Sequence, residues 1–84
     1  MRIEKKTRLE YFQKVLDGDK TFELRLADWE CKPGDTLVLR EHDGKNYTGR
    51  KLEKKVTFVL KTKDIKYFTD EEIKKHGFQV IALK

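Results

Sequence analysis

The feature that most constrains the fold is a helix pattern that passes directly into a strand pattern through Gly18. Before this glycine, apolar residues recur at helical spacing, at Leu9, Phe12, Val15 and Leu16. After it, residues 21–26 alternate polar with apolar side chains, as a half-buried strand does. Glycine adopts the left-handed conformation that closes a helix at low steric cost. The pattern therefore predicts a helix from about Arg8 and a strand from Thr21, joined by a tight turn.

The predicted strand carries its polar side chains on one face. Thr21, Glu23 and Arg25 share this face, and Lys20 stands at the entry to the strand. A cation, a hydroxyl, a carboxylate and a guanidinium would then converge within about 10 Å. Two interpretations stay open, because ion pairs on a solvated strand face are common and cost little. The group is either such a surface or one wall of a binding site.

The same residues resemble a known family. The string Leu16-Asp17-Gly18-Asp19-Lys20-Thr21-Phe22-Glu23-Leu24-Arg25, followed by Pro33-Gly34-Asp35-Thr36-Leu37-Val38-Leu39-Arg40-Glu41, is similar to the signature of small ASCH domains in the PUA-like superfamily. Tyr47-Thr48-Gly49-Arg50 is also similar to phage and bacterial single-domain members. The resemblance spans most of the chain and implies an α+β fold, mostly β. We expect one domain over residues 1–84, a small PUA-like β-barrel of about five strands with two helices.

The remaining patterns agree with this expectation. Strands are predicted at residues 1–5, 36–41, 47–60 and 78–83, with residues 43–46 as a hairpin loop. Thr7 with Glu10 and Thr69 with Glu72 each have the spacing of a helix capping box. The second box predicts a short helix over residues 70–75 that ends at Gly77. The expected core contains Phe22, Leu24, Leu37, Leu39, Val56, Phe58, Val80 and Ile81, with Phe12 and Leu16 packed on it.

Composition limits the class of protein. A chain of 84 residues with one cysteine, Cys31, has no internal disulfide and no site built from several thiolates. No apolar run approaches the roughly 20 residues needed to span a bilayer, and the N-terminal residues lack the apolar segment of a secretory signal. We therefore expect a cytoplasmic protein that does not interact with membranes.

The net charge of +5 is concentrated in one part of the chain. Residues 45–66, the basic segment, carry a local charge of +6, whereas residues 21–44 carry −3. Such a segment attracts polyanions, of which nucleic acid is the usual one. The alternative is that its lysines only protect an edge strand from aggregation. The candidate contacts to a nucleic-acid backbone are Lys45, Arg50, Lys51, Lys55, Lys61 and Lys63.

Several kinds of catalytic site are excluded or weakly supported. The chain contains no serine, so a serine hydrolase site is excluded. His42 and His76 have no partners at metal-ligand spacing, and the glycines form no phosphate-binding loop. Only Lys32 stands beside Cys31 to lower the pKa of its thiol. No metal or cofactor is therefore expected.

The first functional hypothesis is a binding module for RNA or a modified nucleotide, as the PUA-like resemblance implies. Such a site needs donors for phosphate, an acceptor for a base edge and an aromatic side chain for stacking. Lys20 and Arg25 supply donors and Glu23 supplies an acceptor. The candidate ligand-binding residues are Lys20, Thr21, Glu23, Arg25, Trp29 and Tyr47.

Two alternatives belong to other classes. Some ASCH domains resemble bacterial amidohydrolases that deacetylate 4-acetylcytidine and carry the segment Gly-x-Lys-Thr-x-Thr-x-Arg. Lys20 and Arg25 match that lysine and arginine, but Glu23 occupies the position of the threonine nucleophile. An enzyme of this kind would use Lys20, Glu23 and Arg25, although the substitution favours a protein without this activity. The third hypothesis is a phage-type modulator whose partner is another protein, because acidic and basic halves lie side by side in the sequence.

Overall fold

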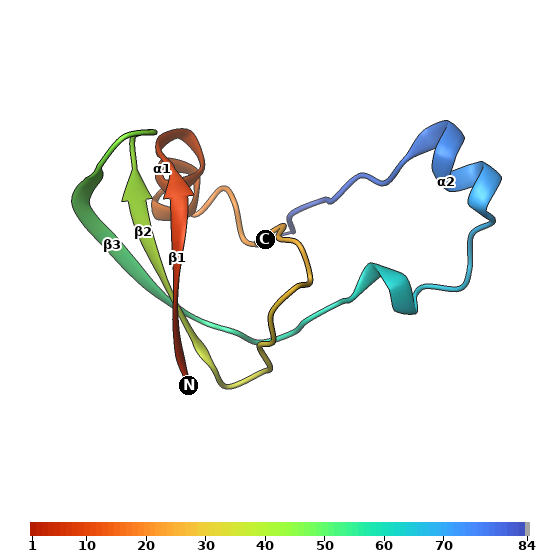
Figure 1. Cartoon of the computed structure of the whole chain (residues 1–84), viewed down its shortest axis with the longest axis horizontal. Helices are drawn as coiled ribbons and strands as arrows, with labels where there is room; N and C mark the ends of the chain where they lie inside the picture. The colour runs from red at the N-terminus through yellow and green to blue at the C-terminus, as the bar shows by residue number, and fades with distance from the viewer. Residues whose placement is uncertain (84) are drawn as a thin grey trace.

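The computed structural model describes residues 1–83, which form a small α+β fold around a three-stranded sheet (Figure 1). Two short helices and one turn of 3-10 helix accompany the strands. In chain order the elements are β1 (Arg2–Arg8), α1 (Leu9–Leu16), β2 (Thr36–His42), β3 (Tyr47–Lys55), the 3-10 helix (Thr62–Asp64) and α2 (Asp70–His76).

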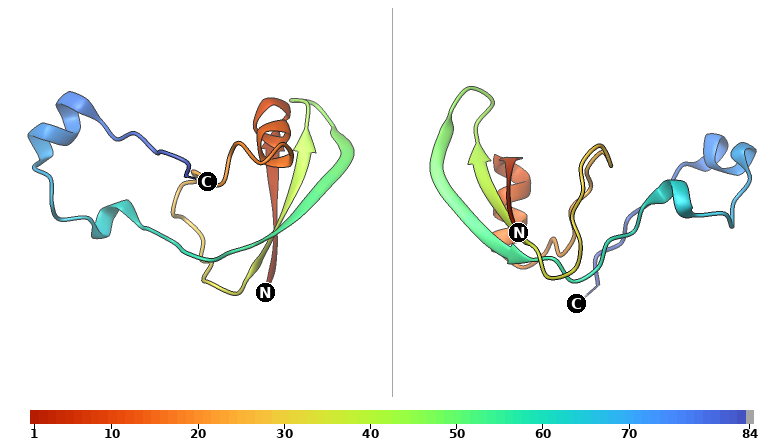
Figure 2. Two further views of the ribbon diagram at one scale, coloured as in Figure 1. Left: turned by 180° about the vertical axis from the view of Figure 1, so that it is seen from behind. Right: turned by 60° about the horizontal axis from the view of Figure 1, so that its bottom comes forward.

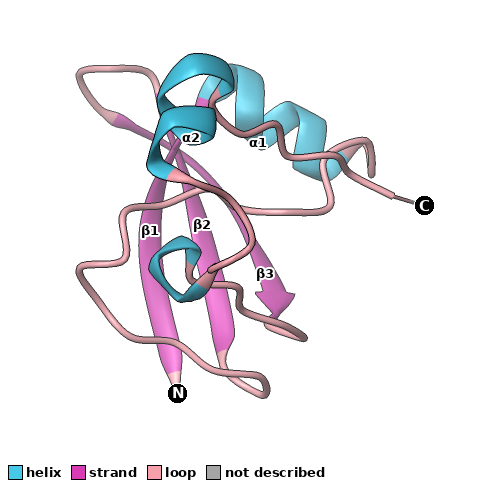
Figure 3. Ribbon diagram, turned by 90° about the vertical axis from the view of Figure 1, so that its right-hand side faces the viewer, coloured by secondary structure: helices cyan, strands magenta, loops and turns pink. Residues whose placement is uncertain are grey.

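The sheet has the order β1-β2-β3, and Figure 3 shows its strands side by side. β1 and β2 are parallel and are connected through α1, with Ile3 paired with Leu37. β2 and β3 are antiparallel and form the predicted hairpin, in which Leu39 pairs with Leu52. Asp43 closes the hairpin loop by accepting two backbone N–H bonds at 2.8 Å, from Lys45 and Asn46.

The core lies between α1 and one face of the sheet. Phe12 and Val15 are the buried residues of α1, because the helical period places both on the side that faces the strands. Val15 forms a cluster with Leu37 and Leu39, as the sequence patterns predict. The partly buried residues packed against this cluster are Ile3, Trp29, Leu52 and Val56.

One of the two predicted capping boxes forms. The Thr69 hydroxyl accepts the backbone N–H of Glu72 at 3.1 Å, the Glu72 carboxylate accepts that of Thr69, and α2 ends at Gly77. The box predicted for α1 is wrong: its N-cap is Arg8, with no side-chain hydrogen bond. Thr7 instead belongs to β1, where its hydroxyl is buried and accepts a bond from Arg25.

Two further predictions need correction. Residues 20–26 and 77–83 contain no strand, and β3 ends at Lys55 instead of continuing to residue 60. The structure therefore shows an open three-stranded sheet in place of a five-stranded barrel. β3 ends where Lys55 pairs with Thr36, the first residue of β2, and only Val56 continues the backbone bonding, with Gly34 and Asp35. Alternation predicts an extended chain with one apolar face, but a strand also needs a neighbour with free backbone groups.

The C-terminal part of the chain leaves the sheet after β3. Residues 56–83 run outward through the 3-10 helix and α2 and then return toward the sheet (Figures 1 and 2). The Thr21 hydroxyl lies 3.4 Å from the backbone oxygen of Leu83, so the return ends beside the segment that follows α1. Several residues expected in the core are exposed, three of them on this path: Leu16, Leu24, Phe58, Val80 and Ile81.

Candidate functional site

A cleft of about 440 Å³ lies beside the apolar core, between the segment that follows α1 and the end of β3. Its floor includes Val15, Leu37 and Leu39, the same residues that form the core cluster. One wall is the segment of residues 20–29, and the other is formed by residues 54–61. The volume lies within the range of roughly 300 to 1,000 Å³ typical of small-ligand sites.

The C-terminus of α1 fixes the position of the first wall. Gly18 has a φ of +83°, and its N–H donates to the Val15 oxygen at 3.1 Å. The N–H groups of Asp19 and Lys20 both lie 3.0 Å from the Lys14 oxygen. These bonds use carbonyl groups that the end of a helix leaves free, and they turn the chain back under α1. The Lys20 side chain is therefore brought into the cleft.

Lys20, Glu23 and Arg25 form a connected triad in the cleft. The Lys20 Nζ donates to Glu23 Oε1 at 3.1 Å, and the Arg25 Nε donates to Glu23 Oε2 at 3.0 Å. The Lys20 Nζ also donates to the Phe22 oxygen at 2.7 Å, and the Arg25 Nη2 to the Thr7 hydroxyl at 3.2 Å. The side chains are only 15%, 18% and 28% exposed, respectively. The sequence thus predicted the group, although an irregular segment and not a strand brings it together.

The electrostatic character of the cleft is strongly positive. Its lining contains five cationic side chains and one carboxylate, Glu23; the cations are Lys20, Arg25, Lys54, Lys55 and Lys61. Lys61 also pairs with the exposed Glu30, with Nζ 3.0 Å from both carboxylate oxygens. This pair raises the pKa of Lys61 above its ordinary value, through the hydrogen bond first and the charge of Glu30 second. Lys61 therefore stays protonated beside the cleft.

Trp29 supplies an aromatic surface in the same cleft. It packs against the core cluster, and the Lys5 Nζ lies 3.8 Å from the centre of its ring. This distance allows a cation–π interaction with one face of the indole. Trp29 is also the only tryptophan in the chain. Its fluorescence can therefore report on the cleft without interference from another indole.

Five of the six predicted ligand-binding residues line this cleft. They are Lys20, Thr21, Glu23, Arg25 and Trp29. Tyr47 lies elsewhere, at the start of β3, with its ring 3.9 Å from the Arg40 guanidinium carbon and 4.9 Å from the centre of the His42 ring.

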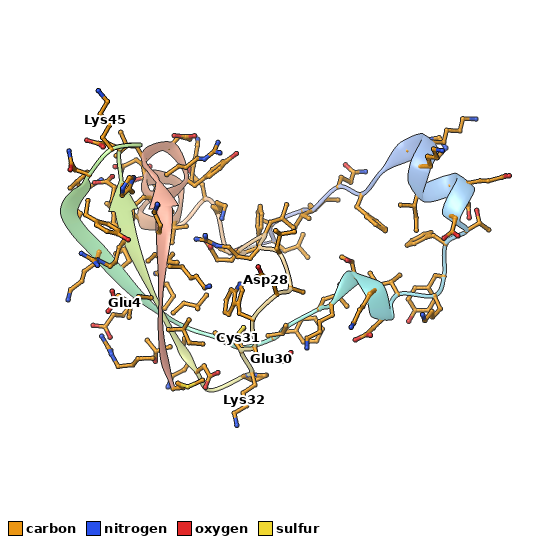
Figure 4. All side chains as sticks on the ribbon, viewed as in Figure 1. Glu4, Asp28, Glu30, Cys31, Lys32 and Lys45 are labelled. Carbon is orange, nitrogen blue, oxygen red and sulfur yellow. The ribbon has the colours of Figure 1, made fainter. Side chains whose placement is uncertain are left out.

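The basic segment does not form one continuous surface. Lys55 and Lys61 line the cleft, whereas Lys63 belongs to the 3-10 helix and Lys51 is exposed on β3. Lys45 projects from the tip of the hairpin, away from the loop that carries the labelled Asp28 and Cys31 (Figure 4). Arg50 pairs with the buried Glu41 through two hydrogen bonds. The six predicted backbone contacts are therefore distributed over several parts of the molecule.

Lys54 is a cleft residue that the sequence predictions omitted. It pairs with Leu37, so it projects from the face of the sheet that carries the core. The signal was present in the sequence, because Lys54 has the same parity as Leu52, whose side chain packs on that core. The Thr7 hydroxyl, which accepts a bond from Arg25, had no comparable signal.

Two features are absent from the part of the chain that the structure describes. Within residues 1–83, no group of three or more histidine, cysteine, aspartate or glutamate residues could hold a metal ion. In the same range, no helix has the length and apolar character needed to cross a membrane.

Comparison with known proteins shows the family. The chain is similar to an Escherichia phage P2 protein described as an uncharacterized 12.9 kDa protein in the GpA 3' region. The two are 41% identical over 61 residues, which are 73% of this chain and 56% of the phage protein. The matched region is thus little more than half of that relative, and no solved structure matches the chain significantly. Residues 4–74 match the family described as a domain of unknown function, DUF3850, and the chain belongs to this family.

Proposed function

We propose that this protein is a binding module for RNA or a modified nucleotide, and that one nucleotide occupies the cleft. The observation that carries the proposal is the combination of an apolar floor with a cationic rim in one cavity. A nucleotide has the complementary character, because its base is flat and largely apolar while its phosphate is anionic. Small-ligand sites commonly combine an apolar lining with a few fixed polar groups.

The triad provides the polar groups for such a ligand. A carboxylate offers about four acceptor positions, and Glu23 uses one on each oxygen for Lys20 and Arg25. The remaining positions can accept an exocyclic amino group such as N4 of cytosine, a pairing known for acidic side chains. Lys20 and Arg25 keep Glu23 in place and still have N–H groups to offer a phosphate. We therefore propose that Glu23 reads a base edge while the cations hold the phosphate.

The resemblance to ASCH domains supports the same proposal. The first of the stretches that carry the resemblance, which ends at Arg25, contributes residues 20–23 and Arg25 to the first wall of the cleft. We propose that DUF3850 domains of this type are relatives of the ASCH group in the PUA-like superfamily, in which RNA binding is a common role. On this view the basic segment contributes Lys55 and Lys61 to phosphate binding at the cleft.

The amidohydrolase hypothesis is a second candidate, because Lys20, Glu23 and Arg25 do meet within hydrogen-bond distance. Such an enzyme would act on an acylated nucleoside such as 4-acetylcytidine. However, a carboxylate that is bonded to two cations is a weak nucleophile, and no threonine stands at position 23. The arrangement supports binding and orientation of a ligand better than attack on it.

The proposal is tested by displacement of a labelled RNA. A fluorescent 12-nucleotide single strand of mixed uridine and cytidine is bound at low salt, and CMP is then added. We expect CMP to displace the RNA from the wild type. Displacement should fail or need at least tenfold more CMP in Arg25→Ala, since a hydrogen bond to a charged group contributes about 1.5 to 3 kcal/mol. Lys74→Ala on α2 is the control, because it removes one positive charge far along the chain from the cleft. RNA binding with no displacement at millimolar CMP would contradict the proposal.

A further inference from the structure

The sheet has a second charged surface on the side away from α1, which we call the outer face. Leu37 and Leu39 face the helix, so the alternate residues of β2 face outward. In the strand register Lys6 pairs with Arg40, and Arg40 pairs with Lys51. Neighbouring strands lie about 4.8 Å apart, so these three cations form one row across the sheet within about 10 Å.

The acidic residues of the outer face neutralise only one of the three cations in this row. Glu4 pairs with Arg40 at 3.3 Å, and Glu53 pairs with Arg2. Within residues 1–83, Lys6 and Lys51 take part in no salt bridge. Two cations of the row therefore remain available to an anionic partner.

An aromatic surface lies beside the row. The Arg40 guanidinium carbon lies 3.9 Å from the centre of the Tyr47 ring. Tyr47 is still 46% exposed. The pairing register of β3 shifts between Arg40 and His42, and Gly49 has a φ of +99° within this irregularity. Such bulges commonly redirect side chains, and here the extra residues let Tyr47 pair with His42 while its ring reaches Arg40.

Arg40, Lys51 and Tyr47 line a groove with the buried Val38 at its floor. Lys6 lies beside this groove, paired with Arg40 on the neighbouring strand. A positive groove that tracks a backbone, together with an aromatic ring on which a base can stack, is the combination that binds single-stranded nucleic acid.

We propose that the outer face binds the sugar–phosphate backbone of a single RNA strand, with Lys6 and Lys51 at phosphates and Tyr47, which Arg40 supports, stacked on a base. This inference rests on the proposed function, because the same strand would place one nucleotide in the cleft. Lys55 connects the two surfaces: it lines the cleft and has the parity of Lys51 on β3. The RNA strand would pass around the free edge of β3. Among the described strands, β3 is paired only with β2, so its other edge has no neighbour.

The test compares Lys6→Ala/Lys51→Ala with Lys74→Ala/Lys75→Ala, which makes the same change in charge on exposed residues of α2. Anisotropy of the labelled 12-nucleotide RNA is measured between 50 and 200 mM salt. If about four phosphates are bound, the wild-type slope of log affinity against log salt is near −3. The outer-face variant should be shallower by about 1.4, since two contacts are lost, and the α2 variant should match the wild type.

Tyr47 is tested separately with Ala and Phe. Tyr47→Ala should weaken RNA binding by roughly 5- to 150-fold, the range for loss of one stacked base, whereas Tyr47→Phe retains the ring and should bind normally. Equal melting temperatures of the two variants exclude unfolding as the cause. Equal RNA affinity in Tyr47→Ala, Tyr47→Phe and wild type would overturn the stacking assignment.

The arms of the experiment separate the two proposals. CMP binding, followed through Trp29 emission, should be unchanged in Lys6→Ala/Lys51→Ala. If CMP and RNA both bind but the salt slope of this variant equals that of the wild type, the outer-face proposal is overturned and the cleft proposal stands. If RNA binding depends on Lys6 and Lys51 while CMP leaves Trp29 emission unchanged, the cleft proposal is overturned and the outer face still binds RNA. Equal affinity of the outer face for an acidic peptide and for RNA would also overturn the assignment.

Discussion

Arg50 holds the buried carboxylate of Glu41 through two hydrogen bonds, with Nε 3.0 Å from Oε1 and Nη2 2.9 Å from Oε2. The Thr48 hydroxyl donates a third bond to Oε1 at 2.6 Å. The same guanidinium donates to Gln13 at 3.1 Å and lies 4.9 Å from the ring centre of Phe12. This contact therefore connects β2, β3 and α1, and it gives a structural role to an arginine that the sequence assigned to nucleic acid.

The Glu41 contact predicts a pH dependence of stability. Bonds from Arg50 first and Thr48 second lower the pKa of Glu41 below its ordinary value. A carboxyl group whose pKa is lower in the folded state adds stability above its unfolded pKa of about 4.3, and this is lost as the pH falls through the folded pKa. Urea midpoints of the wild type should therefore decline below about pH 4. In Glu41→Gln the decline should be smaller, and an identical acid limb in both proteins would contradict the role of this pair.

The buried and exposed phenylalanines predict very different effects on stability. Phe12 is 1% exposed, so Phe12→Ala should lower the free energy of unfolding by about 3 to 5 kcal/mol. Phe58 is 75% exposed, and Phe58→Ala should change it by less than about 0.5 kcal/mol. Chemical denaturation of both variants measures the difference. A similar loss in the two would show that residues 56–60 pack in the core, as the sequence alone suggested.

The triad predicts that the protein does not hydrolyse 4-acetylcytidine. Both oxygens of Glu23 are bonded to cations, and no threonine stands at this position to act as a nucleophile. Incubation with 4-acetylcytidine should release no cytidine that chromatography can detect. Turnover that disappears in Lys20→Ala would place this chain among the amidohydrolases, with Glu23 acting as a base or nucleophile.

Glu23 also predicts selectivity for the base. Glu23→Ala removes the acceptor for an amino group and frees Lys20 and Arg25 to bind phosphate. We expect this variant to bind inorganic phosphate more tightly and to lose most of the preference for CMP over UMP. Competition of the two nucleotides against labelled RNA measures the preference. A preference that is unchanged in Glu23→Ala would assign base selection to another group.

The sequence predicted the elements that depend on local rules. The helix α1, the hairpin at residues 43–46 and the Thr69 capping box all formed, because spacing or turn chemistry within a few residues determines them. The strands at 21–26 and 78–83 did not form, because neither alternation at the first nor a continuous apolar run at the second identifies a hydrogen-bonding partner. The Arg50 contact with Glu41 depends on the register shift in β3, which no local pattern showed.

Five of the six candidate residues line the cleft, but the backbone that holds them is not the predicted strand. Lys20, Glu23 and Arg25 do meet. The chain turns because the N–H groups of residues 19 and 20 donate to the Lys14 oxygen, and Arg25 donates to the Thr7 hydroxyl on β1. The sequence patterns instead placed Glu23 and Arg25 in a strand and Thr7 at a helix cap, so they did not predict these contacts. Short-range spacing found Glu23 and Arg25, because side chains two residues apart share a face of an extended segment. Lys20 is three residues from Glu23, and it follows the turn that the bonds to the Lys14 oxygen make.

Titration with CMP, followed through Trp29 emission, measures whether the cleft beside Trp29 binds a nucleotide. We expect a saturable change in emission for the wild type. The change should be lost or need at least tenfold more CMP in Arg25→Ala and Lys20→Ala, and it should be preserved in Lys74→Ala. Emission that does not respond to CMP, or that responds equally in the wild type and Arg25→Ala, would show that the cleft does not bind a nucleotide through these residues.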